Sequence, residues 1–239
     1  MKQFTLILFV LVFTQPLFSQ DEEQRPKFYL GIAYGTSFSL GDFQATDIGN
    51  PDAGFAKNGQ RFDIYGGYFL NEKQKVTLTA GLRYQKFETE IEDLIESFRD
   101  ENPGAEVSGK TEDWQVYSFL LGLAYQVNIG RRFNFFPRVG IGPMLVTNPG
   151  ITIDIPNGIF TNNFERSSES GVGFGYEFGI GLRTDLGRHF SLLPTFTLSG
   201  GWVTIQDVTV TTDNIGFMDD YQPFIQSFNI GLSLGYRFY

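Results

Sequence analysis

Large apolar residues alternate with small or polar residues along most of this chain. Between Val172 and Thr184, six large apolar residues alternate with four glycines, Glu177 and Arg183. The segment from Phe228 to Phe238 repeats the pattern, with a large apolar residue at every second position. Alternation with a period of two predicts β-strands, because successive side chains of a strand point to opposite faces.

The same alternation recurs in further segments and predicts eight strands in total. They cover residues 28–38, 61–70, 75–87, 114–129, 133–146, 172–184, 190–202 and 228–238. Most of these segments have ten residues or more. Strands of ordinary globular proteins have about 5–6 residues, whereas a tilted strand that crosses a membrane needs about 9–11. The lengths therefore favour membrane-crossing strands.

The size difference between the two strand faces predicts which face meets lipid. A transmembrane barrel turns apolar residues to lipid and polar residues inward, and eight strands leave room only for the barrel's own side chains. We therefore expect an all-β, eight-stranded antiparallel up-and-down transmembrane β-barrel. A soluble lipocalin-like binder, with the faces reversed, is the alternative. Pro137, Pro143 and Pro194 lie on the large face and predict local bulges, since proline lacks a ladder donor.

The connections between the predicted strands alternate in length. Residues 71–74, 130–132 and 186–189 form short turns, and residues 39–59, 88–112, 147–168 and 207–222 form long loops. Outer-membrane barrels have short periplasmic turns and longer extracellular loops. We therefore expect both chain termini in the periplasm.

The first twenty residues have the pattern of a secretory signal. Lys2 precedes the apolar run 6–13, and Pro16 follows it. Such a run is too short to span a bilayer as a helix, although a short anchor helix is an alternative. We predict a cleaved signal over residues 1–20 and an outer-membrane barrel over residues 21–239. The absence of cysteine fits a bacterial envelope better than a disulfide-stapled extracellular module.

Charge and hydropathy narrow the class of protein further. The chain has a net charge of −9, which argues against a nucleic acid partner. Its mean hydropathy of −0.13 excludes a bundle of membrane helices. Residues 39–60, 88–113, 147–169 and 207–222 together carry a net charge of −16. This acidic outer surface would attract basic partners or cations, or it serves only to solvate exposed loops.

The second long loop contains a predicted amphipathic helix. Thr89 to Glu92 form a capping-box pattern, and Pro103-Gly104 would end the helix. The proposed docking residues combine an apolar stripe with adjacent acids: Ile91, Glu92, Leu94, Ile95, Glu96 and Phe98. The helix could dock another envelope protein, or it could fold its apolar face over the barrel mouth.

Seven charged residues fall on the predicted inward face. They are Arg61, Asp63, Arg83, Arg138, Glu177, Arg183 and Arg237. Buried charges must pair or be solvated, so we expect an ion-pair network that fills the lumen. A narrow anion-selective path is the alternative.

Residues that could carry catalysis are scarce. The single histidine, His189, lies in a predicted short periplasmic turn, where a Ser-His-Asp triad is improbable. We expect no enzyme activity, no cofactor and no metal site. An outer-leaflet lipid-modifying enzyme remains a lesser alternative.

Several segments together resemble a known family. The signal ending at Gln20, the opening strand 28–38, the glycine-alternating strand 172–184 and the closing residues 236–239 resemble the outer-membrane β-barrel domain family common in Bacteroidetes. The chain is similar to the PorT-like branch, and more distantly to OmpA/OmpX-type eight-stranded barrels. The resemblance implies insertion into outer-membrane lipid by the barrel-assembly machinery, a structural or interaction role, and a link to type IX secretion. It supplies no catalytic residues to transfer.

Overall fold

The computed structural model describes residues 26–47, 50, 52–70, 75–129, 133–157, 160–212 and 215–239. The predicted signal 1–20 and the predicted turns 71–74 and 130–132 lie outside the described residues. Within the described ranges, no helix has the length and hydropathy that a membrane span requires.

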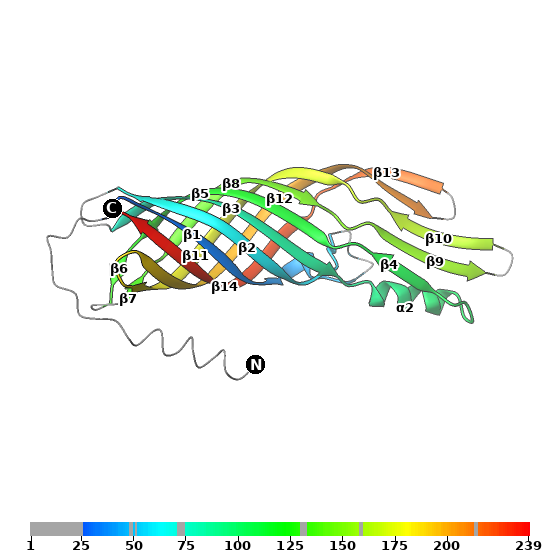
Figure 1. Cartoon of the computed structure of the whole chain (residues 1–239). Helices are drawn as coiled ribbons and strands as arrows, with labels where there is room; N and C mark the ends of the chain where they lie inside the picture. The colour runs from blue at the N-terminus through cyan, green and yellow to red at the C-terminus, as the bar shows by residue number, and fades with distance from the viewer. Residues whose placement is uncertain are drawn as a thin grey trace, which may run out of the picture.

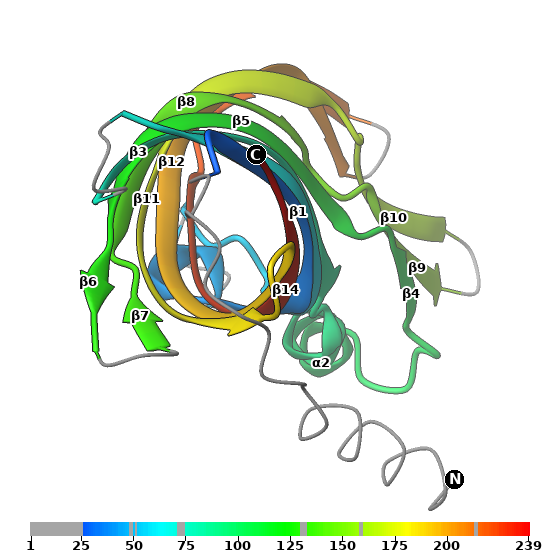
Figure 2. The same ribbon diagram turned by 60° about the vertical axis from the view of Figure 1, so that its left-hand side comes forward.

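Eight long strands form a closed ring, in which each strand pairs antiparallel with two neighbours (Figures 1 and 2). In order around the ring they are β1 (Phe28–Ser39), β2 (Ala56–Phe69), β3 (Val76–Thr89), β5 (Trp114–Tyr125), β8 (Arg138–Thr147), β11 (Ser170–Leu186), β12 (Phe190–Thr212) and β14 (Phe224–Phe238). β14 pairs with β1 and closes the ring. The predicted antiparallel up-and-down barrel is confirmed, and closure leaves no ring edge exposed to lipid.

The strand register shows how strongly the strands are staggered. Starting from Phe28, the paired residues around the ring are Tyr68, Leu78, Leu123, Val139, Phe178, Leu198, Phe228 and then Phe38. The row thus returns to β1 ten residues beyond its starting point. Such a stagger requires strands that tilt against the barrel axis. Every member of the row has a large apolar or aromatic side chain. The row therefore forms a continuous hydrophobic band around the outside of the barrel.

The two faces of the ring have the expected inside-out arrangement. Large outward side chains are exposed, among them Leu82 at 60% and Ile141 at 57%. Polar inward side chains are buried, and Arg61 is only 1% exposed. Exposed apolar surface of this extent needs lipid to cover it. The lipocalin-like alternative is therefore wrong.

The three prolines differ in their effect on the strands. β5 and β8 are interrupted beside Pro137, and β6 (Val127–Asn128) and β7 (Phe133–Phe135) continue beyond the break. Pro143 pairs with Phe174, and Pro194 pairs with Leu232, without any register shift. The bulges expected at Pro143 and Pro194 are therefore wrong. Each proline lacks only its own donor, so the ladder to one neighbour continues.

A second sheet extends from one end of the barrel. β12 continues past the ring and pairs with β13 (Ile215–Tyr221) and β10 (Phe160–Arg166). β9 (Ile151–Asn157) and β4 (Ser108–Thr111) complete the strand order β13-β12-β10-β9-β4. With α2 (Glu92–Glu101) these strands form what we call the extension, and the C-terminus lies at the opposite end (Figure 1).

The helix α2 forms where its spacing predicts, but its cap differs. Its N-cap residue is Ile91, which provides no side-chain cap. Thr89 pairs with Ala56 as the last residue of β3, and its hydroxyl donates to the Glu112 carbonyl. The predicted capping box is wrong because Thr89 remains in the sheet. The helix ends before Pro103-Gly104 as expected, with Gly104 at a φ of +89°.

The apolar face of α2 packs on the extension. Ile91 and Leu94 lie in one buried cluster with Ile151, Ile153 and Ile155 of β9. The alternative that α2 covers the barrel mouth is therefore wrong. Figure 2 shows α2 beside the ring rather than across it.

Candidate functional site

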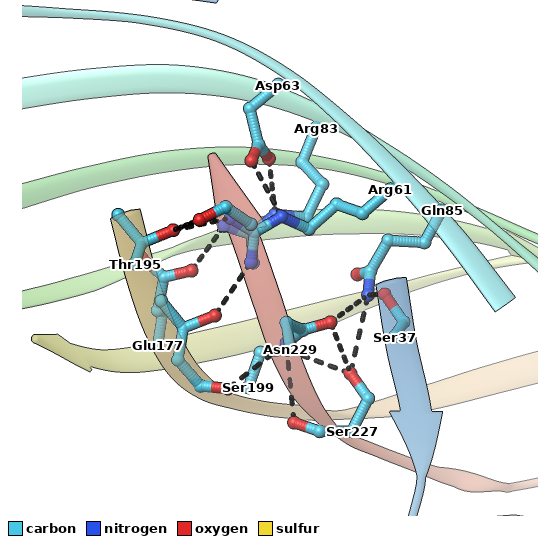
Figure 3. Close-up of polar contacts among 12 residues, drawn as sticks. Ser37, Arg61, Asp63, Arg83, Gln85, Glu177, Thr195, Ser199, Ser227 and Asn229 are labelled. Atoms are coloured by element: carbon cyan, nitrogen blue, oxygen red, sulfur yellow. Dashed lines mark hydrogen bonds and ion pairs between the residues drawn. The ribbon is translucent and has the colours of Figure 1, made fainter. Parts of the chain in front are cut away.

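The centre of the lumen holds an alternating chain of five charged side chains. Figure 3 labels Arg61, Asp63, Arg83 and Glu177 of this chain. Asp63 forms an ion pair with Arg61, whose Nε lies 2.8 Å from Asp63 Oδ2, and its Oδ1 accepts a hydrogen bond from Arg83 Nε at 2.6 Å. Arg83 also pairs with Glu177, and Arg138 Nε lies 2.8 Å from Glu177 Oε1. These residues lie on the inward faces of β2, β3, β8 and β11. There two carboxylates connect three guanidinium groups.

Neutral polar groups surround this chain. Arg61 Nη1 donates to the Thr197 hydroxyl at 2.8 Å. On β3, Gln85 Nε2 donates to Ser37 at 3.0 Å and to Asn229 Oδ1 at 2.9 Å (Figure 3). Asn229 Nδ2 in turn donates to Ser199 at 2.9 Å. Such hydrogen bonds satisfy polar groups that a dry lumen would otherwise leave unpaired.

A second ion-pair group lies nearer the C-terminal end of the barrel. Asp185 forms ion pairs with two arginines: its Oδ1 lies 3.4 Å from Arg183 Nε and its Oδ2 lies 3.2 Å from Arg237 Nη1. The sequence-based set omitted Asp185, because the strand was expected to end at Thr184, whereas β11 continues to Leu186. Asp185 lies an even number of positions from Glu177 and Arg183 on the same strand, so all three share a face. This spacing is the signal that could have identified Asp185.

Apolar clusters lie in the lumen on both sides of the central ion pairs. At the C-terminal end, buried Tyr29, Phe69, Ala124, Phe136 and Leu193 form one cluster. At the other end, Phe43 packs with its ring centroid 5.1 Å from that of Phe87 and 5.3 Å from that of Trp114. The larger lumen-facing cluster there also includes Val116, Met144, Val146, Val203, Ile205, Val208 and Ile225.

Phe43 belongs to a loop that folds into the end of the barrel that carries the extension. This loop joins β1 to β2 and contains the short helix η1 (Gly41–Phe43), visible in blue inside the ring in Figure 2. Trp114 Nε1 donates to the Gly54 carbonyl at 2.8 Å, and the Tyr221 hydroxyl donates to the Ala53 carbonyl at 3.3 Å. The loop is therefore anchored as a plug, the role that was considered for α2.

The space left beside the ion pairs is small. A pocket lined by Asp63, Arg83, Arg138 and Glu177 has a volume of about 40 Å³. This volume has room for about one or two water molecules. This pocket between the paired charges is therefore too small for a hydrated solute.

The single histidine packs against the end of the barrel. His189 lies in the turn between β11 and β12, and its ring stacks on Tyr236 at 5.3 Å. Its Nδ1 lies 3.3 Å from the Arg237 carbonyl oxygen. Across the described residues, no group of three His, Cys, Asp or Glu side chains could hold a metal ion.

The extension presents an acidic exterior. On α2, Glu92, Asp93, Glu96, Asp100 and Glu101 are exposed.

At the end of β10, the Arg166 guanidinium lies 5.8 Å from the centroid of the Tyr221 ring. Burial raises the pKa of Tyr221 above its usual value, and the positive charge of Arg166 opposes this shift.

These features define an integral β-barrel with a closed lumen. The chain belongs to the outer membrane protein β-barrel domain family, whose model matches residues 5–238. It is therefore an outer-membrane protein. No curated protein matches the sequence significantly.

Several solved outer-membrane proteins are similar to this chain at low sequence identity. A major outer membrane protein from Thermus thermophilus has 14% identity and a TM-score of 0.50, covering 88% of this chain and 99% of that chain. Ail, the attachment invasion locus protein of Yersinia pestis, has 16% identity and a TM-score of 0.46, covering 90% and 100%. OprG from Pseudomonas aeruginosa has 13% identity and a TM-score of 0.45, covering 90% and 96%.

Proposed function

We propose that this protein is a non-enzymatic interaction barrel, whose extension binds another protein of the bacterial envelope. The observation that carries the proposal is the extension itself, a five-stranded sheet with a packed helix above a plugged barrel. A structure of this size beyond the membrane band is not needed to close the lumen. Its acidic surface favours a basic partner.

The closed lumen supports this role over that of a narrow solute or ion channel. Two apolar clusters and two ion-pair groups occupy the described interior. The outer-leaflet lipid-modifying enzyme has less support, because His189 lies at the end of the barrel away from the extension.

We further propose an orientation and a pathway. With the extension outside the cell, both termini lie in the periplasm, after cleavage of a signal at residues 1–20 and insertion by the barrel-assembly machinery. The resemblance of the strand 172–184 and the closing residues to PorT-like barrels supports an accessory role in a type IX-like secretion system.

The acidic face of α2 provides a test of the interaction role. The combined variant Glu92→Gln, Glu96→Gln and Asp100→Asn removes three charges from exposed positions and leaves the buried apolar face intact. We expect it to lose most of the partner that co-purifies after cross-linking of native envelopes.

A matched control removes three charges from the same loop outside the helix: Glu88→Gln, Glu106→Gln and Glu112→Gln, all at exposed positions. This control should retain the partner. Unchanged co-purification in both variants, with normal heat-modifiable gel migration, would contradict the proposed role of α2.

A further inference from the structure

The strand β13 leaves an unusual amount of apolar surface uncovered. Ile215, Phe217 and Met218 are 59%, 65% and 67% exposed. β13 pairs with β12 along one edge, and within the described part of the chain no strand pairs with its other edge. An open, apolar edge strand is a template for pairing with another chain.

Lipid does not account for this exposure. β13 pairs with β12 from Ile205 to Thr212, beyond Trp202, the last residue of β12 that pairs with the ring strand β14. Two exposed polar residues of β12, Thr204 and Gln206, lie between Trp202 and Val208, where the continuous pairing with Asp219 to Ile215 of β13 begins. The apolar residues of β13 therefore face water unless another protein covers them.

The opposite edge of the extension shows how a free edge is normally protected. β4 has four residues, Ser-Gly-Lys-Thr, and its Lys110 is exposed. Short length and an exposed lysine both oppose pairing with other strands. β13 has seven residues and no basic side chain, so it lacks this protection.

The uncovered residues continue a face that α2 covers elsewhere. Phe98 of α2 lies 5.8 Å from Phe164 of β10, measured between ring centroids. Phe164 pairs with Thr212, which pairs with Ile215. Directly paired residues share a face of the sheet, so Ile215 and Phe217 extend the same face past the helix.

The charge around β13 selects the chemistry of a partner. Asp219 and Asp220 are adjacent, exposed and directed to opposite faces of the strand. From His189 to Tyr236 the chain contains no Lys or Arg. A second copy of this hairpin would bring acids toward acids without any basic residue to pair with them.

We propose that β13 is a docking edge, to which an envelope protein adds an extended segment as a further strand. This inference rests on the proposed interaction function and assigns its site. The segment carries two adjacent basic residues opposite Asp219 and Asp220 and apolar residues beside Ile215, Phe217 and Met218. Main-chain hydrogen bonds supply the affinity, and side chains on alternate faces supply the specificity.

A photo-cross-linking experiment in native cells tests the inference. p-Benzoylphenylalanine replaces Met218 on β13 or, as the matched control, Lys110 on the opposite edge strand β4. We expect a cross-link from position 218 to one envelope protein, mapped to a segment with adjacent basic residues, and none from position 110. Adding Asp219→Lys and Asp220→Lys should lower its yield about tenfold, because like charges then oppose each other.

Every other result would overturn the docking edge. These results are no cross-link from position 218, a cross-link to lipid or to a second copy, and a yield unaffected by the two lysines. If position 218 fails while the α2 charge variant still loses its partner, the interaction role stands without this site. If both experiments fail, the proposed function fails as well.

Discussion

At the scale of single residues, the lumen depends on carboxylates that each serve more than one arginine. Asp63 bridges Arg61 and Arg83, and Glu177 bridges Arg83 and Arg138. The alternation along the sequence predicted that all of these residues face inward, because an odd or even position along a strand decides which face a side chain occupies. Which carboxylate meets which guanidinium depended on the register between strands, which parity does not contain.

Removal of the Asp63 charge should destabilise the barrel strongly. The variant Asp63→Asn leaves two buried guanidinium groups short of a carboxylate, and breaking such a pair costs about 3–5 kcal/mol. We expect this loss in urea unfolding of the vesicle-inserted protein, followed by heat-modifiable gel migration. The exposed control Asp220→Asn should change stability by less than about 0.5 kcal/mol. Equal unfolding midpoints for the two variants would contradict the bridging role.

Two glycines of β8 should respond very differently to the same substitution. A Cβ atom at Gly142 would lie 1.9 Å from the Phe119 carbonyl oxygen, whereas one at Gly140 would lie 3.5 Å from its nearest neighbour. Gly142→Ala should therefore cost about 1–3 kcal/mol through overpacking. Gly140→Ala should be nearly neutral in the same unfolding assay, and a neutral Gly142→Ala would disprove the close approach.

At the scale of elements, α2 shows what helical spacing can and cannot predict. The apolar residues at 91, 94, 95 and 98 predicted the helix, and the structure contains it. The packing partner of the helix, β9, begins about fifty residues later in the chain. A periodic pattern identifies an apolar face, but the element that covers it depends on how the loops meet.

Truncation of the buried helix residue should loosen the extension and spare the barrel. Leu94→Ala opens a cavity between α2 and β9, at a local cost of about 2–5 kcal/mol. We expect faster amide hydrogen exchange in residues 92–101 and 151–155, with unchanged exchange in β1 and β14. The exposed control Glu96→Ala should leave both regions unchanged. Faster exchange throughout the barrel would show that the extension and the ring unfold as one unit.

At the scale of the whole molecule, the lumen is closed at several levels. The loop carrying Phe43 packs into the end of the barrel beside the extension, the ion pairs lie at the centre, and the cluster around Tyr29 lies toward the other end. Eight strands enclose an interior just wide enough for the barrel's own side chains, so we expect no conducting path.

Planar-bilayer recording measures whether ions pass through the lumen. We expect no stable unitary conductance from the intact protein. The variant Phe43→Ala should remain silent as well, because the central ion pairs and the Tyr29 cluster are unchanged. Stable conductance from the intact protein would favour the channel alternative over the interaction role.

The amino-acid sequence by itself determined the β class, the inside-out faces and the inward charged set. These properties follow from a period of two and from side-chain size, which are local features of a strand. Only the tertiary structure decided the plug at the end of the barrel beside the extension, the packing of α2 on β9, the place of Asp185 in the second ion-pair group and the open edge of β13. Each of these depends on contacts between segments far apart in the chain, where loop paths and strand register determine which side chains meet.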